Sequence, residues 1–167
     1  DLPQIFQFQS DWFGDWMNDP ENASKVVDGN GEPKVANHYS NSERITEFKM
    51  NGDEDYIREH SLTNAGVYFN LGETMVKYGR YGYYVFLNFK NPLRVKNYIS
   101  DIVNPLTGKK IELENINNND IKYLKEQGYD SVIGSTGQVV AFNKNQIKLA
   151  DGTNATFNPD TNDIRFQ

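Results

Sequence analysis

The feature that most constrains the fold is a nearly continuous apolar run in the middle of the chain, from Tyr83 to Phe89. It reads Tyr-Tyr-Val-Phe-Leu-Asn-Phe, so aromatic and aliphatic residues fill almost all of it. Runs of this kind are typical of a buried β-strand. Asn91-Pro92 ends the run, because proline lacks the N–H that a strand ladder needs. The sequence therefore predicts a packed domain organised around a central strand.

Shorter patterns on either side predict more strands than helices. Strands are expected in two arms of 24–38 joined by a turn at 28–31, then at 66–69, 129–133, 138–142 and 146–149. Short helices are expected in 1–20, at 73–78, and from Asp120, as the cap, to Gly128. Segment 40–65 is expected to be a long loop and 150–167 a tail across the surface. This mixture predicts an α+β domain built on a mixed or antiparallel sheet with short flanking helices.

Composition and charge narrow the class of protein. The 167 residues suffice for a single domain, 1–167, with an N-terminal helical segment at 1–23. Apolar residues make up 37% and aromatic residues 13%, which favours a folded core over disorder. The net charge of −6 argues against a broad electrostatic grip on nucleic acid or an anionic membrane. No apolar run approaches the roughly 20 residues that span a bilayer, so a soluble protein without a membrane partner is expected. The start at Asp1 suggests a module excised from a larger protein.

The sequence lacks the residues that several kinds of catalytic or metal site require. The chain has no cysteine, and therefore no disulfide, thiol nucleophile or zinc-thiolate site. Its two histidines, His38 and His60, are far apart, so no metal site is expected. A glycine-rich phosphate loop, HExxH and G-x-S-x-G are also absent. His60, in a polar loop, and the acidic run 53–55, which is typical of a solvated face, receive no role.

An ordered series of residues points to other chemistry: His38 at the end of an expected strand, then Gly66 to Phe69, Tyr78 and Gln138. The stretches that contain or accompany them are Trp12–Trp16, Ser24–Pro33, His38–Ser40, Gly66–Phe69, Val85–Leu93, Gln138–Lys148 and Asn162–Arg165. In this order they resemble the ADP-ribosyltransferase-like domains of phage and mobile-element polyvalent proteins. That family is part of the His-Tyr-Glu lineage, which includes diphtheria toxin and the poly-ADP-ribose polymerases. The resemblance spans almost the whole chain and implies the split mixed or antiparallel sheet of ADP-ribosyltransferases.

The resemblance also implies roles for these residues in binding and cleaving NAD, the substrate. His38 would hydrogen-bond the adenosine-side ribose, and backbone groups beside it would bind the carboxamide. Tyr68 and Tyr78 would stack on the nicotinamide ring. Gln138 falls where a catalytic glutamate contacts the 2′-hydroxyl of the nicotinamide ribose. The implied catalytic residues are His38, Tyr68 and Gln138, and the implied NAD-binding residues are His38, Tyr39, Ser40, Gly66, Tyr68, Phe69 and Tyr78.

Two residues depart from the family pattern. Gln138 keeps the hydrogen-bond acceptor of a glutamate but loses its negative charge, so slower chemistry and no chain elongation are expected. Tyr39 replaces the glycine that normally follows the histidine, and its side chain is expected to crowd the pocket for the nicotinamide amide. Each candidate also has a structural reading, since a histidine at a strand end, tyrosines in an aromatic-rich chain and a polar residue at a strand start are common without a site.

Three functions stay open. The first is a mono-ADP-ribosyltransferase of phage or mobile-element origin, an effector or toxin that acts as a monomer on a host protein or nucleic acid in the bacterial cytoplasm. The second is a non-catalytic module that binds NAD or an ADP-ribosylated partner. The third is a toxin of the same fold that hydrolyses NAD. Acceptor choice depends on loops such as 40–65 and 94–119, so the NAD motifs do not name the acceptor.

Overall fold

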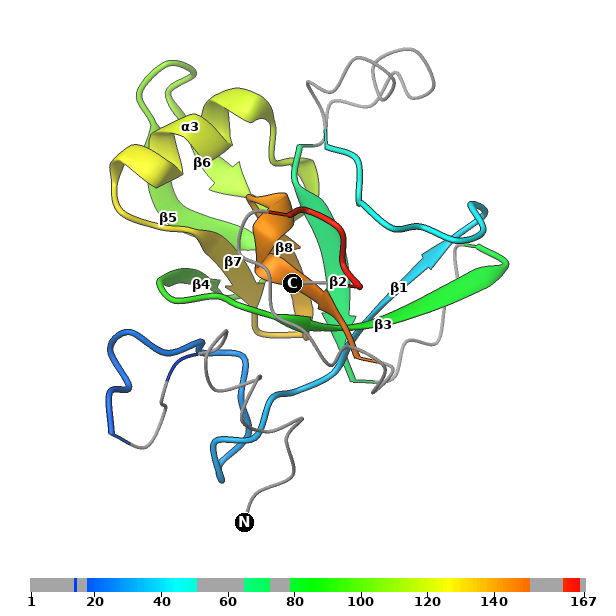
Figure 1. Cartoon of the computed structure of the whole chain (residues 1–167). Helices are drawn as coiled ribbons and strands as arrows, with labels where there is room; N and C mark the ends of the chain where they lie inside the picture. The colour runs from blue at the N-terminus through cyan, green and yellow to red at the C-terminus, as the bar shows by residue number, and fades with distance from the viewer. Residues whose placement is uncertain (1–13, 15–17, 51–64, 73–78, 151–160, 166–167) are drawn as a thin grey trace. The chain divides into compact units, whose positions relative to one another are not determined.

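The computed structural model describes residues 14, 18–50, 65–72, 79–150 and 161–165. Strands dominate this part of the chain, together with one α-helix (Figure 1). The elements in chain order are β1 (Ala36–Ser40), β2 (Val67–Leu71), β3 (Tyr81–Leu87), β4 (Pro92–Val95), β5 (Ile99–Asn104), β6 (Lys109–Glu112), the 3-10 turn η1 (Leu113–Asn115), α3 (Asn118–Glu126), β7 (Ser131–Gly134), β8 (Gln138–Ala141), the 3-10 turn η2 (Lys144–Gln146) and β9 (Ile147–Leu149). The helices expected in 1–20 and at 73–78 fall almost entirely outside the described residues.

The main sheet is mixed, as expected. Its hydrogen-bonded strand order is β4-β7-β8-β2-β1-β3-β9, and β5 and β6 form a separate two-stranded sheet. Strands β4 and β7 are parallel, whereas β1 and β3, β3 and β9, and β7 and β8 are antiparallel. The chain divides into two compact units. The first comprises 1–47, 70–90 and 145–167, and the second comprises 48–69 and 91–144.

The first unit is organised around β3, the strand expected from the apolar run. It pairs on one side with β1 and on the other with β9. Val85 and Leu87 are fully buried. Phe89 is also buried, but it lies beyond the strand because its carbonyl accepts the Lys25 N–H (2.6 Å). The observed strand therefore begins and ends slightly earlier than the apolar run.

The segment before β1 is tied to the end of β3. The buried Ser24 hydroxyl donates to the Leu87 carbonyl (2.8 Å) and accepts from the Phe89 N–H (3.2 Å). These bonds direct the chain toward the end of β3 and away from the ladder of β1. Of the expected hairpin in 24–38, the first arm consequently forms only a single bridge, between Val27 and Pro33.

The C-terminal tail contributes to the core, although a surface position is expected from its composition. Ile164 has 0% exposure. Its N–H donates to the Thr46 carbonyl (2.7 Å), and its own carbonyl accepts from the Leu149 N–H (2.7 Å). Beside it, Arg165 donates to the Asp163 carboxylate at 2.9 and 2.6 Å. The tail therefore binds β9 through Ile164, and its charged neighbours stay outside the core.

The second unit packs α3 against a buried apolar cluster. The cluster consists of Ala65, Leu93, Val95, Ile111, Leu113, Ile116, Ile121, Leu124, Val132, Val140 and Phe142. The Asn117 side chain accepts from the Asp120 N–H (2.9 Å), and the Asp120 carboxylate accepts from the Asn117 N–H (3.1 Å). This reciprocal pair is a capping box. The helix cap is therefore Asn117, and Asp120, the expected cap, is the other member of the box.

A hairpin occupies part of 94–119, which is expected to be a loop. Strands β5 and β6 pair Ile99 with Glu112 and Val103 with Lys110. In Figure 1 this hairpin lies next to α3, and the Asn104 side chain donates to the Asp120 carboxylate (2.8 Å). No helix in the described ranges is long and apolar enough to cross a membrane.

Candidate active site

The predicted site residues lie on strands of both units. His38, Tyr39 and Ser40 are in β1 of the first unit, and Gly66, Tyr68, Phe69 and Gln138 are at or in β2 and β8 of the second. Tyr78 lies outside the described residues.

His38 is the middle residue of β1, although its expected place is a strand end. In the antiparallel ladder it lies opposite Tyr83, so the two side chains share one face. The Tyr83 hydroxyl donates to the Ser42 carbonyl (2.6 Å) and accepts from the Ile45 N–H (3.0 Å). The half-buried His38 therefore lies beside a tyrosine that fixes the segment following β1.

The Tyr39 side chain lies on the opposite face of β1 from His38, because side chains alternate along a strand. A Cβ on Gly82, its partner in β3, would come within 2.9 Å of the Tyr39 ring. The Tyr39 hydroxyl is 3.2 Å from that of Tyr84. The Tyr39 side chain thus packs over Gly82 and Tyr84, and its expected crowding of the pocket for the nicotinamide amide stays a prediction.

Both residues that flank segment 73–78 contact β1. The Asn37 side-chain amide donates to the Gly72 carbonyl (2.7 Å). At the other end, a Cβ on Gly79 would lie 2.4 Å from the Ser40 carbonyl carbon, so only glycine allows the two backbones to approach so closely. Gly72 and Gly79, the described residues on either side of 73–78, thus both lie close to the strand that carries His38.

Tyr68 is anchored through its hydroxyl group. The hydroxyl donates to the Leu113 carbonyl (2.7 Å) and accepts from the Ile116 N–H at 3.4 Å. The half-buried ring packs against the apolar cluster of the second unit. Tyr68 therefore has a structural role in joining β2 to η1, and its stacking role stays a prediction.

Gly66 and Phe69 belong to the packing around Tyr68. Gly66 has φ +79°, and a Cβ there would lie 2.7 Å from the Ala141 carbonyl oxygen, so β2 begins tightly against β8. Phe69 is 1% exposed, and its ring contacts that of Phe48 edge-on at 5.3 Å between centroids. The Phe69 ring is thus part of the core, and its assignment to the NAD site stays a prediction.

Gln138 opens β8 and is half-buried. Alternation along the strand places its side chain on the same side as Val140, a member of the cluster against which Tyr68 packs. The turn before it is closed by the Gly137 N–H, which donates to the Gly134 carbonyl (3.1 Å). The second unit therefore brings Gln138 and Tyr68 to the same side of its strands.

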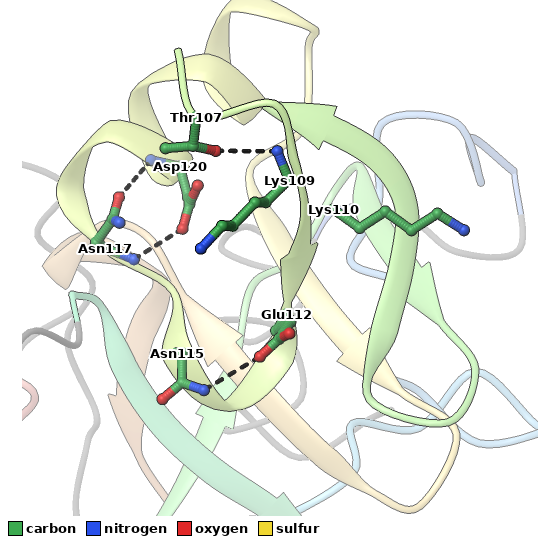
Figure 2. Close-up of a pocket in the computed structure, with 7 residues that line it drawn as sticks. All are labelled: Thr107, Lys109, Lys110, Glu112, Asn115, Asn117 and Asp120. Atoms are coloured by element: carbon green, nitrogen blue, oxygen red, sulfur yellow. Dashed lines mark hydrogen bonds between the residues drawn. The ribbon is translucent and has the colours of Figure 1, made fainter. Parts of the chain in front are cut away.

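A polar pocket of about 520 Å³ lies beside α3 (Figure 2). Its lining residues are Thr107, Lys109, Lys110, Glu112, Asn115, Asn117 and Asp120. In Figure 2 Lys109 extends toward Asn117 and Asp120, whereas Lys110 points away. The segment from Glu112 to Asn117, which supplies three of the lining residues, also includes Leu113 and Ile116, whose backbone groups bind Tyr68. No sequence pattern marks this pocket, because its residues come together only when β6 packs beside the start of α3.

Lys148 is a buried charged residue that sequence reasoning does not detect. It is 1% exposed and lies opposite Phe86 in the β3–β9 ladder, on the face away from His38. Desolvation by burial lowers the pKa of its ammonium group. The surrounding residues 146–149 alternate as in an ordinary strand, so nothing in the sequence distinguishes Lys148 from a solvent-facing lysine. Among the described residues, no group of acidic or histidine side chains is placed to hold a metal ion.

Comparison with known proteins identifies the family. The family model described as ADP-ribosyltransferase in polyvalent proteins matches residues 28–157, which include His38, Tyr68, Tyr78 and Gln138. Searches of curated proteins and of solved structures give no match. The matched part is well over half of the chain, and it contains the mixed sheet described above. The chain therefore belongs to the ADP-ribosyltransferase family of polyvalent proteins.

Proposed function

We propose that this chain is a mono-ADP-ribosyltransferase that transfers ADP-ribose from NAD to a host macromolecule and releases nicotinamide. The main support for this proposal is the family match over 28–157, within which His38, Tyr68 and Gln138 occur in the order of the lineage's motif. ADP-ribosyltransferases in general use NAD as their substrate. The placement of Tyr68 and Gln138 on one side of the second unit supports the proposal, because both have to reach the same part of that substrate.

In the proposed reaction the bond between nicotinamide and ribose C1′ breaks, and its electron pair leaves with the nicotinamide. A nucleophile of the acceptor attacks C1′ and loses its proton. His38 holds the adenosine-side ribose, and Tyr68 and Tyr78 stack on the departing ring. The contacts of Asn37 with Gly72 and of Ser40 with Gly79 support this assignment for Tyr78, because these two glycines flank its segment and lie close to the strand of His38. The protein's contribution is positioning and electrostatics.

Gln138 sets the expected character of the activity. Its amide oxygen accepts a hydrogen bond from the ribose 2′-hydroxyl, as a carboxylate would. The amide carries no charge, so it stabilises the positive charge that develops at C1′ less well than a glutamate. We therefore expect slow transfer of single ADP-ribose groups rather than synthesis of chains.

The deciding experiment incubates the protein with NAD labelled in its adenylate half and with a bacterial lysate. Released nicotinamide and label in the protein and RNA fractions are then measured. Label that disappears with His38→Ala, but not with His60→Ala, supports the transferase and identifies the acceptor class. His60 is the matched control because it is the chain's only other histidine. If His38→Ala leaves transfer to every fraction unchanged, the site assignment is wrong.

Two alternatives have distinct outcomes in the same assay. A module that only binds NAD or ADP-ribose is favoured by the neutral Gln138, and it would bind NAD in calorimetry without releasing nicotinamide over hours. A hydrolase would release nicotinamide without labelling either fraction. The proposed setting is the bacterial host cytoplasm, and the net charge of −6 favours a protein acceptor over a nucleic acid.

A further inference from the structure

Leu113 occupies the point at which three parts of the second unit meet. It is 1% exposed and begins η1, directly after β6. Its N–H donates to the Tyr98 carbonyl (2.8 Å), and its carbonyl accepts the Tyr68 hydroxyl (2.7 Å). Tyr98 itself has φ +68°, a conformation that a tyrosine rarely adopts. The backbone of Leu113 thus connects the strained start of β5 with Tyr68 in β2.

The Leu113 side chain reaches the turn that precedes Gln138. A Cβ built on Gly134 would lie only 2.6 Å from Leu113 Cδ2 and 2.9 Å from the Gln138 carbonyl oxygen. The absence of a side chain at Gly134 therefore allows Leu113 to pack directly on the turn backbone. That turn is short, because Gly137 donates to the Gly134 carbonyl (3.1 Å). A displacement of Leu113 would consequently act on the start of β8.

From these contacts we infer that Leu113 is a positioning residue that fixes Tyr68 and Gln138 relative to each other. The inference rests on the proposed function in so far as these two residues serve the reaction. Tyr68 is held at two points, the Leu113 carbonyl and the Ile116 N–H, so a shift of η1 turns or translates the phenol ring. Gln138 is held through the packing of Leu113 on Gly134. The side chain and the backbone carbonyl of one buried residue therefore position two groups that lie on different strands.

The first test measures position directly and needs no activity. The full chain, labelled with ¹⁵N and ¹³C, is compared by NMR with the Leu113→Ala and Leu124→Ala variants. Leu124 is the matched control, because it is an equally buried leucine of the same cluster and its carbonyl bonds stay in the turn after α3. The expected result is that Leu113→Ala shifts both the Tyr68 ring and the Gln138 amide resonances, whereas Leu124→Ala shifts them much less. Equal shifts in the two variants, or none at Gln138, would overturn the inference.

A second pair of variants covers the case in which Leu113→Ala does not fold. Gly134→Ala pushes against Leu113 from the other side, and Gly29→Ala is its control, because a Cβ at Gly29 meets nothing within 4 Å. Gly134→Ala is expected to shift the Leu113 and Tyr68 resonances. Adding Leu113→Ala to Gly134→Ala removes one of the two close contacts, so the double variant is expected to be perturbed less than the sum of the single ones. Strict additivity of the two changes would contradict the inference.

The activity measurement separates this inference from the proposed function. If the wild-type chain releases nicotinamide, Leu113→Ala is expected to lower kcat by roughly tenfold to a hundredfold, since a misplacement of about 1 Å near a site has effects of that order. The KM for NAD should change less, and folded Leu124→Ala should keep nearly full kcat. Equal kcat values for the two variants would refute the positioning role in the reaction. A wild-type chain without NAD turnover would refute the proposed function, and the NMR comparison would still decide the role of Leu113.

Discussion

The hydroxyl of Tyr68 binds within the protein, so its ring is the part left to contact a ligand. The Tyr68→Phe variant deletes the donor to the Leu113 carbonyl and the acceptor of the Ile116 N–H. Because both buried backbone groups then lose a partner, the free energy of unfolding should fall by about 1–2 kcal/mol in urea denaturation. The ring that would stack on nicotinamide is retained, but it loses the two hydrogen bonds that fix its position.

The control for this variant is Tyr123→Phe. Tyr123 packs against the same cluster, and its hydroxyl makes no hydrogen bond within the described residues. Its removal should change stability by less than about 0.5 kcal/mol. Equal losses in the two variants would mean that the hydroxyl bonds of Tyr68 contribute nothing specific.

Lys148 should make stability depend on alkaline pH. Its pKa is lowered from 10.5 by burial, so between the lowered pKa and 10.5 the unfolded chain binds more protons than the folded one. The free energy of unfolding contributed by this residue therefore rises with pH through that window and levels off above it. In Lys148→Met this rise should be absent, as judged by urea titrations from neutral pH to about 10.5. Lys109→Met, which changes an exposed lysine, should keep the wild-type pH dependence.

At the level of secondary-structure elements, one residue of the C-terminal tail, Ile164, packs in the core. Ile164 is completely buried and hydrogen-bonds to both Thr46 and Leu149 through its backbone. Ile164→Ala should lower the free energy of unfolding by about 2–4 kcal/mol, because it leaves a cavity in a packed region. Leu106→Ala, at a leucine that is 71% exposed in the β5–β6 turn, should change it by less than about 0.5 kcal/mol. Denaturant unfolding of both variants tests the prediction, and similar values would show that the tail is not part of the core.

The elements that sequence predicts well are those with strong local patterns. The run at 83–89 predicts β3, and the turn at Gly134–Gly137 followed by Gln-Val-Val-Ala predicts β8. The β5–β6 hairpin is missed because its strands mix charged residues with isolated apolar ones, and its pairing across a bulge is a tertiary property. The cap of α3 is Asn117 and not Asp120, because Asp120 is the N3 residue of the capping box, whose carboxylate accepts the Asn117 N–H.

For the candidate site, too, some features come from the sequence and others depend on the tertiary structure. Its proposed residues and their order along the chain come from the sequence, through the resemblance to the family, and their roles stay predictions. Their partners cannot be read from the sequence, because the Tyr68 hydroxyl binds a carbonyl 45 residues away and Gly134 accommodates a leucine from a preceding element. Such contacts depend on how η1 packs. The face on which the Tyr39 side chain lies also follows only from the β1–β3 register.

For the whole molecule, the net charge and the neutral residue at position 138 are the properties that most affect the proposed activity. The chain has 23 acidic and 17 basic side chains, a net charge of −6. This negative charge disfavours approach to a polyanion and hence a nucleic-acid acceptor. In the proposed assignment, the position at which the lineage uses a carboxylate toward the ribose is occupied in this acidic protein by an amide, that of Gln138. Acidity of the molecule as a whole therefore does not supply the local negative charge that would stabilise the developing cation.

The Gln138→Glu variant tests whether that local charge limits the reaction. A carboxylate at the start of β8 would keep the hydrogen bond to the ribose 2′-hydroxyl and add electrostatic stabilisation at C1′, so nicotinamide release should accelerate roughly tenfold to a hundredfold. Gln127→Glu is the matched control, because it adds the same charge at the exposed end of α3. Initial rates with saturating NAD, compared for variants with equal thermal unfolding midpoints, measure the effect. If Gln138→Glu is no faster than Gln127→Glu, position 138 does not face the ribose and the transfer must depend on another group.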